Sequence, residues 1–372
     1  MAFSSLFEPV DLGSLKLRNR FVMAPMTRSR ASRDGILPES APTYYAQRAT
    51  AGLIVSEGVC VSPVAVGNPK VPGIWTNDQM ASWAKVASAV HGAGGTIVAQ
   101  LWHTGRASHP SLQPGGQAQV GPSAIGIDGS TYARDGRAPH VTPRALETLE
   151  IPVIVAQYQR AAHNAIAAGL DGVEIHAANG YLIDQFLQDN ANTRTDAYGG
   201  TIENRARFLA EVIAEVSAEI GADRVGVRIS PASTFQGMAD SDPAALFGHV
   251  LAVLDEAAVA YLHIVEPGID GSESLAGAHD VARNGLGSAW ARERYTGKIV
   301  AAGGYQAASA EAAVLSGHVD AVAFGRPYIA NPDLPERVAG GTPLTESDRA
   351  TYYGGGDAGY IDYPASQGTV SG

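Results

Sequence analysis

The sequence contains one cysteine, Cys60, in 372 residues, which excludes an intramolecular disulfide framework and any cluster held by several cysteines. Cys60 stands between Val59 and Val61, where a small buried hydrophobe is a more ordinary role than a nucleophile. Basic residues are also few: 26 Lys and Arg against 37 Asp and Glu give a formal charge of −11. This balance argues against nucleic acid or an anionic membrane surface as the main partner, although a local basic pocket is compatible with a phosphate.

Long apolar runs are absent as well. None approaches the ~18–20 residues that a membrane-spanning helix needs, and residues 1–6 lack the basic and apolar regions of a signal peptide. We therefore expect a cytoplasmic protein that does not act at a membrane. The histidines lack metal-ligand spacing, so no metal site is predicted. With 45% hydrophobic and 17% charged residues, the chain has ample material for a large core.

Short apolar runs alternate with helical patterns along the chain. This alternation predicts an α/β fold, a (β/α)8 TIM barrel. A doubly wound open sheet is the alternative, but its G-x-G-x-x-G fingerprint is missing after the first strand. The predicted strands are Phe21–Met26, Gly52–Val59, Thr96–Trp102, Gly172–His176, Val225–Ser230, Tyr261–Glu266, Lys298–Ala302 and Ala321–Gly325.

Two segments do not fit the alternation of strands and helices. Phe7–Arg18 predicts a small hairpin that caps one barrel end, and Thr104–Leu149 predicts a long irregular excursion after the third strand. A helix is expected over Asn77–His91, with Asn77 or Asp78 as its N-cap. No interior linker separates domains, so we expect residues 1–372 to form a single domain.

The predicted fourth strand ends in a run of polar side chains. His176, Asn179 and Tyr181 follow its apolar residues within six positions. A capped turn explains Asn179 and Gly180, but it leaves His176 and Tyr181 without a reason. Because active-site groups of such barrels lie at the C-terminal ends of the strands, this stretch predicts the mouth of an active site.

An arginine lies within another predicted strand. Arg228 follows Val225-Gly226-Val227, where an unpaired cation is costly to bury. Two roles are open for it: pairing with a strand carboxylate such as Glu174 or Glu266, or binding an anionic ligand.

Glycines end the last two predicted strands. Gly303-Gly304 follows the seventh strand, and Gly325-Arg326 follows the eighth. Either pair alone is typical of a tight turn. Together, at the strands where such barrels bind phosphate, they favour a phosphate site.

Several ordered segments carry a family resemblance. The most specific are His176–Leu187, Asn192–Gly200 and Glu203–Arg205, with support from Ala24–Arg30, Gln100–Arg106, Phe324–Pro327, Asn331–Pro335 and Gly359–Pro364. On these residues the sequence resembles the Old Yellow Enzyme family of FMN-dependent ene-reductases over nearly its whole length. The resemblance implies an FMN-binding (β/α)8 barrel with an N-terminal hairpin lid.

The resemblance also implies a tightly bound, non-covalent FMN. Thr27 would place its hydroxyl near the O4 edge of the ring, Gln100 would hold the pyrimidine edge, and Arg228 would lie by N1 and O2. Thr27, where one branch of the family has Cys, is similar to the branch named for the yeast enzymes. The implied cofactor-binding residues are Pro25, Met26, Thr27, Gly58, Gln100, Arg228, Gly303, Gly304, Gly325 and Arg326.

The implied reaction reduces the C=C bond of an activated alkene. NADPH or NADH would pass a hydride to flavin N5, and the flavin would pass it to the alkene. His176 and Asn179 would donate hydrogen bonds to the substrate oxygen, and Tyr181 would supply the proton. Trp102 and Tyr353 match substrate-pocket positions, although both suit packing aromatics equally well.

The implied substrates are α,β-unsaturated carbonyls, maleimides, nitroalkenes and nitrate esters. The alternatives are desaturation or isomerisation on the same site, or a flavin-binding barrel without turnover. Larger relatives need a cysteine-bound iron–sulfur cluster, which one cysteine excludes. Thr104–Leu149, Ser233–Asp240 and Pro267–Arg283 depart from the family pattern and leave the substrate open. We expect a small-molecule partner, no nucleic acid, and a monomer or homodimer.

Overall fold

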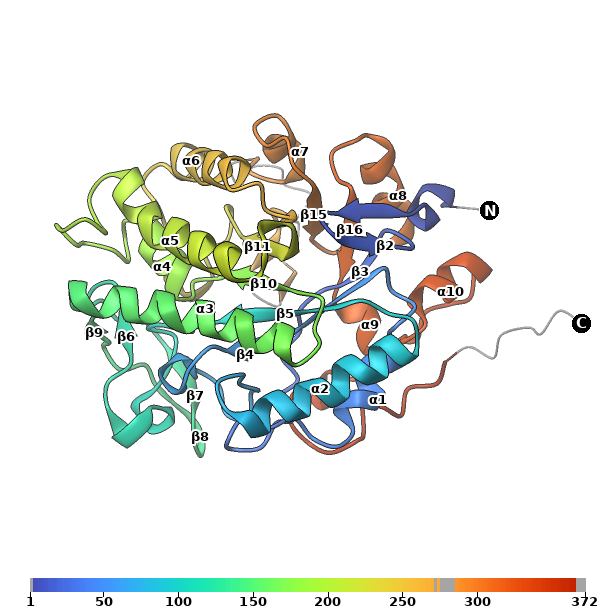
Figure 1. Ribbon diagram of the computed structural model, residues 1–372, viewed down its shortest axis with the longest axis horizontal. Coiled ribbons are helices and arrows are strands. Elements are labelled where there is room, and N and C mark those ends of the chain that lie inside the picture. Colours follow the sequence, from blue (N-terminus) through green and yellow to red (C-terminus); the bar gives the residue numbers. More distant parts are fainter. Residues whose placement is uncertain (1–2, 271–272, 275–284, 366–372) are drawn as a thin grey trace, which may run out of the picture.

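The computed structural model describes residues 3–270, 273–274 and 285–365, and a closed barrel of eight parallel strands forms its centre (Figure 1). In chain order these strands are β3 (Phe21–Met23), β4 (Leu53–Cys60), β5 (Ile97–Trp102), β10 (Gly172–His176), β11 (Val225–Ile229), β12 (Tyr261–Val265), β15 (Ile299–Ala302) and β16 (Ala321–Phe324). The ring closes between β16 and β3, each strand pairing with its neighbour in the sequence of barrel strands. The (β/α)8 class predicted from the sequence is confirmed.

Helices follow the strands and surround the barrel (Figure 1). They are α1 (Ala41–Ala46), α2 (Asn77–Gly92), α3 (Ile151–Ala167), α4 (Leu182–Leu187), α5 (Ile202–Ile220), α6 (Pro243–Glu256), α7 (Ser288–Arg292), α8 (Ala307–Leu315), α9 (Arg326–Ala330) and α10 (Leu334–Gly340). Within the described ranges, no helix is both long and apolar enough to cross a membrane.

The N-terminal hairpin closes the barrel end opposite to the C-terminal strand ends. It consists of β1 (Val10–Leu12) and β2 (Leu15–Leu17), which pair antiparallel. At its turn, Ser14 N donates to the carbonyl oxygen of Asp223, just before β11 (2.9 Å). Its apolar side chains join a buried cluster with residues of β3, β4, β5, β12, β15 and β16. The predicted cap is therefore present, and it leaves the other barrel end open.

Some predicted boundaries were wrong. The first strand ends at Met23 rather than Met26, because Pro25 has no N–H to continue the ladder. The N-cap of α2 is Thr76, not Asn77 or Asp78: Thr76 and Gln79 form a reciprocal capping box. The excursion over Thr104–Leu149 also contains short strands: β6 (Val120–Gly121), β7 (Ser130–Ala133), β8 (Gly136–Pro139) and β9 (Arg144–Ala145). β13 (Ile269–Asp270) and β14 (Glu273–Ser274) follow β12, and the rest of Pro267–Arg283 lies largely outside the described residues.

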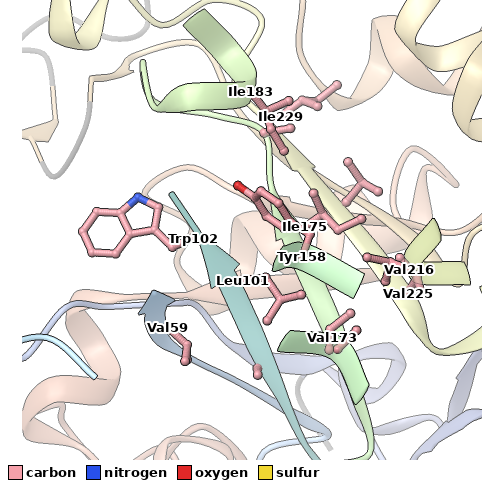
Figure 2. Packing of buried hydrophobic residues seen from close by; sticks show 14 of the residues in the cluster. Val59, Leu101, Trp102, Tyr158, Val173, Ile175, Ile183, Val216, Val225 and Ile229 are labelled. Atoms are coloured by element: carbon pink, nitrogen blue, oxygen red, sulfur yellow. The ribbon is translucent and has the colours of Figure 1, made fainter. Parts of the chain in front are cut away.

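Alternation along β5, β10 and β11 separates an apolar outer face from inward-pointing polar side chains. Leu101, Val173, Ile175 and Val225 point outward and pack with Tyr158 of α3 and Val216 of α5 (Figure 2). The residues between them point inward. Strand register aligns Gln100 with Glu174, His176 with Arg228, and Arg228 with His263. The barrel interior therefore carries a layer of polar side chains.

One glycine makes room for this layer. A Cβ on Gly226 would lie 2.2 Å from the Cζ atom of Tyr261, which stands opposite in the register. The Tyr261 ring fills that space, and its hydroxyl donates to Glu174 Oε2 (3.1 Å). Gly226 is therefore fixed by close approach rather than by backbone conformation.

The substitution Gly226→Ala tests this packing. We expect a loss of ~1–3 kcal/mol in unfolding free energy, because the added methyl group displaces the Tyr261 ring. Gly248→Ala in α6 is the matched control, since a Cβ there meets no heavy atom within 4 Å. That control should gain ~0.5–1 kcal/mol from helix propensity and reduced chain entropy. Urea denaturation of both variants measures the difference, and equal stabilities would contradict the assignment.

Candidate active site

A large cavity opens at the C-terminal ends of the barrel strands. Its volume is about 1420 Å³, larger than the ~300–1,000 Å³ of most small-ligand pockets. It has room for a large cofactor together with a substrate. It is lined by all fifteen residues singled out in the sequence: Pro25, Met26, Thr27, Gly58, Gln100, Trp102, His176, Asn179, Tyr181, Arg228, Gly303, Gly304, Gly325, Arg326 and Tyr353.

The loop after β10 shapes one wall of the cavity. Asn179 and Gly180 both adopt left-handed backbone conformations, with φ of 57° and 71°. The turn is held by two side chains: Asn179 N donates to Ser230 Oγ (2.8 Å) and Gly180 N donates to Asp184 Oδ2 (2.8 Å). Asn179 Oδ1 is buried without a partner among the described residues. The amide of Asn179 thus lines the cavity with unused hydrogen-bonding capacity.

Two buried histidines near this wall are neutral. His176 Nδ1 accepts from Ala178 N (3.3 Å) and His103 Nδ1 accepts from Gly105 N (3.1 Å), so each ring carries its proton on Nε2. Burial lowers the pKa of both His103 and His176 to about 3. Of the two, His176 lines the cavity. His176 therefore offers a neutral N–H donor at any working pH.

Tyr181 lies among aromatic rings at the same wall. Its ring contacts those of Trp102 (centroids 4.9 Å apart, 84°) and His176 (5.1 Å, 75°) edge to face. Burial raises the pKa of the Tyr181 hydroxyl, and a side-chain hydrogen bond from Gln236 opposes the rise. The hydroxyl is therefore protonated at neutral pH and oriented by its neighbour.

The strands on either side of β10 carry polar side chains that can hold a ring with polar edges. Arg228, beside His176 on β11, is half-buried, and its buried Nε has no partner in the part of the chain that the structure describes. Gln100 reaches the same region from β5. The other carboxylate suggested for Arg228, Glu266, accepts instead from Tyr305 Oη (2.7 Å) and Ser288 N (3.2 Å). Arg228 thus keeps donor capacity for a ligand.

The glycine loops form the far end of the cavity. Gly304 has a left-handed φ of 73°, and a Cβ on Gly303 would lie 2.4 Å from Cβ of Glu266. Gly325 approaches Met26, whose Sδ would be 3.7 Å from an added Cβ. Backbone amides of glycines that line the cavity beside Arg326 suit a phosphate. From Gln100 and Arg228 to these loops, the residues fit the ring and phosphate of FMN.

A C-terminal strap, residues 349–361, carries Tyr353 to the mouth of the cavity. Arg28 Nη2 donates to the carbonyl oxygen of Gly359 (2.7 Å), and Arg30 donates to four further strap carbonyls. Both arginines closely follow Thr27, which lines the cavity floor. The strap and the floor are therefore one connected unit.

Sequence reasoning missed two parts of the lining. Gln236, in the loop after β11, has a left-handed φ of 61° and lies against Gly180. The β7–β8 hairpin adds Tyr132 and Arg137, whose guanidinium lies 5.0 Å from the Tyr132 ring centroid. The dipeptide Asp135-Gly136 at its turn is a hairpin signal that could have found it. Nothing comparable marks Gln236 in the sequence.

Comparisons with known proteins also point to a flavin-dependent oxidoreductase. Residues 5–345 match the NADH:flavin oxidoreductase / NADH oxidase family. The chain is 43% identical over 362 residues to 12-oxophytodienoate reductase 1 of Oryza sativa subsp. japonica, covering 96% of this chain and 92% of that one. Morphinone reductase in complex with tetrahydroNAD superposes with a TM-score of 0.89 at 46% identity, covering 97% of each chain. The old yellow enzyme homologue from Zymomonas mobilis has a TM-score of 0.92 at 42% identity, covering 97% of this chain and 99% of that one.

The neutral histidines make stability depend on pH. Their pKa of about 3 lies below the ordinary 6.5, so their contribution is complete above pH ~6.5 and is lost as the pH falls toward ~3. His103→Gln removes one such group outside the cavity lining. Relative to this variant, the wild type should lose up to ~1.4 kcal/mol of unfolding free energy per pH unit between about pH 6 and 4. Denaturation at several pH values measures this, and parallel curves would refute it.

Proposed function

The chain belongs to the NADH:flavin oxidoreductase / NADH oxidase family, as an Old Yellow Enzyme relative, and we propose that it is an FMN-dependent ene-reductase. It reduces the C=C bond of activated alkenes at the expense of NADPH or NADH. One observation carries the assignment: the same cavity is lined both by residues suited to FMN and by the His176, Asn179 and Tyr181 group. A binding barrel without turnover would not need a proton donor beside hydride chemistry.

We assign the ring of FMN to the region of Gln100 and Arg228. Thr27, with Pro25, Met26 and Gly58, would lie against the ring. The phosphate would be bound at Gly303, Gly304, Gly325 and Arg326. Bound FMN supplies the hydride chemistry, accepting a hydride from the nicotinamide and giving one to the alkene.

His176 and Asn179 bind and polarise the substrate in this proposal. The Nε2–H of neutral His176 and the amide of Asn179 donate hydrogen bonds to the carbonyl or nitro oxygen of the alkene. These donors withdraw electron density from the double bond and stabilise the charge that develops on the oxygen. One such preorganised donor is typically worth ~3–4 kcal/mol, or roughly 10²–10³ in rate.

Tyr181 supplies the proton. Because burial raises its pKa, the hydroxyl keeps its proton at neutral pH until a carbanion-like α-carbon takes it. Gln236 holds the hydroxyl in place, and Trp102 keeps the ring upright against the wall. Tyr353 would border the substrate from the strap.

The names of the relatives suggest cyclic enones as substrates, and α,β-unsaturated carbonyls are the first class to test, followed by maleimides, nitroalkenes and nitrate esters. Desaturation or isomerisation is the alternative outcome at the same site.

Three further expectations stay predictions: a single domain, a monomeric or homodimeric state, and a cytoplasmic location. Light scattering on the purified protein decides the oligomeric state.

Spectroscopy tests the function directly. The purified protein should be yellow, should bleach anaerobically with NADPH or NADH, and should regain its colour on addition of 2-cyclohexenone. Comparing the two nicotinamides at equal concentration gives the coenzyme preference. A colourless protein that binds no added FMN would refute the proposal. If the flavin is bleached but none of the four alkene classes restores its colour, the protein is only a flavin-binding barrel.

Tyr181→Phe tests the proton donor. Alkene-dependent reoxidation should fall by ~10²–10⁴-fold, the usual contribution of a positioned acid, while bleaching by the nicotinamide persists. Stopped-flow spectroscopy separates these two half-reactions. Tyr132→Phe is the control, since it removes a hydroxyl from the cavity mouth without touching the proposed donor. Unchanged reoxidation in Tyr181→Phe would remove Tyr181 from the mechanism.

A further inference from the structure

A buried carboxylate stands behind the residues assigned to the flavin ring. Glu174, on β10, has no exposed surface and points into the barrel interior. Its Oε1 accepts from Gln100 Nε2 (2.9 Å), and its Oε2 accepts from His263 Nδ1 (2.8 Å) and Tyr261 Oη (3.1 Å). Three donors from the neighbouring strand β5 and from β12 thus converge on one carboxylate. Glu174 itself does not line the cavity.

This carboxylate fixes the orientation of the Gln100 amide. A carboxylate only accepts hydrogen bonds, so the NH₂ group of Gln100 must face Glu174. The carbonyl oxygen of Gln100 is then left for the cavity. An acceptor there matches the ring N–H at position 3 of FMN, which is a donor. With the amide turned the other way, an NH₂ group would face that N–H.

Glu174 also carries a charge that opposes Arg228. Burial alone would raise the pKa of Glu174, but His263, Arg228 and Gln100 outweigh it and hold the pKa below its usual range. Burial lowers the pKa of His263, so that this ring is a neutral donor to the carboxylate. Glu174 and Arg228 are therefore opposite charges that stabilise one another electrostatically within the barrel, and Arg228 is the one that reaches the cavity.

We propose that Glu174 is a positioning residue of the flavin site, which fixes the Gln100 amide, offsets the charge of Arg228, and thereby lowers the reduction potential of bound FMN. The inference rests on the proposed function. Two-electron reduction adds negative charge to the ring, and Arg228 favours that charge. Glu174, behind Gln100 and Arg228, disfavours it, which keeps the bound cofactor a strong enough hydride donor for alkenes.

The competing explanation is that the charge of Glu174 has a purely structural role. The midpoint potential of bound FMN separates this explanation from the proposed one. Glu174→Gln removes the charge but preserves the shape, so the midpoint potential should rise. Removing one buried unit charge near the cofactor should change the equilibrium constant for FMN reduction by roughly tenfold, which is ~30 mV for a two-electron couple. Tyr261→Phe removes one donor from the Glu174 carboxylate and so leaves its charge less neutralised. The midpoint potential of FMN in this variant should therefore fall, by an amount that corresponds to a few-fold change in the same reduction equilibrium.

The experiment equilibrates each FMN-loaded protein anaerobically with a reference dye. Asp320→Asn is the control: Asp320 is a paired carboxylate between Arg292 and Lys298, just before β16 and outside the cavity lining, and its potential should equal that of the wild type. Opposite shifts in Glu174→Gln and Tyr261→Phe support the inference, because loosened packing has no reason to give opposite signs.

The outcomes distinguish this inference from the proposed function. A wild type that binds no FMN overturns both. A yellow wild type with an unchanged or lowered potential in Glu174→Gln overturns the inference alone. If Glu174→Gln does not fold or bind FMN, Tyr261→Phe decides: a lowered potential supports the role, and an unchanged or raised one refutes it.

Discussion

The site depends on one constraint, the alternation of side chains along strands that close into a barrel. Every second residue of β5, β10, β11 and β12 points inward, and the register pairs Gln100 with Glu174 and, two residues further along the strands, Arg228 with His263. A polar layer at that depth is stable only because each group meets a partner or the cavity. The apolar hairpin closes the barrel below it. A ligand in the cavity above this layer can therefore accept hydrogen bonds from the donors that remain unused, such as Nε of Arg228.

Above that layer, geometry is set by loops that the barrel holds in unusual conformations. Asn179 and Gly180 turn the chain sharply after β10, so that His176, Asn179 and Tyr181 share one wall although their spacing fits neither a strand nor a helix. Gln236 meets them from the loop after β11, where Asn190 Nδ2 donates to the Gly237 carbonyl (2.7 Å) and Arg106 Nη2 to the Gln236 carbonyl (3.2 Å). Substrate groups and cofactor groups thus come from rigid strand ends, with loops adding the closing contacts.

Local patterns were sufficient for the barrel and for the strand-end residues. Apolar runs and their polar ends are properties of a few consecutive residues, so Gln100, His176 and Arg228 could be assigned to strand ends from the amino-acid order alone. The partner of Arg228 could not be assigned in this way: Glu174 or Glu266 and an anionic ligand were both open. The fold removes Glu266, since it accepts from Tyr305 and Ser288 instead. Gln236 was missed because long-range contacts position it, whereas the β7–β8 hairpin does carry a local turn signal, Asp135-Gly136. The cap of α2 was misplaced because Asn77 and Asp78 are as good caps by type as Thr76, and the decisive partner is Gln79.

The strap has a consequence for the order of events during synthesis. Arg28 and the Gly359 carbonyl that it binds are 331 positions apart in the chain. At ~5–20 residues per second, a ribosome needs roughly 15–65 s to make that intervening length. During this time the barrel strands are made one after another, while Arg28 and Arg30 lack the strap carbonyls that they bind in the folded protein. The strap can therefore narrow the mouth of the cavity only after all eight barrel strands have been made.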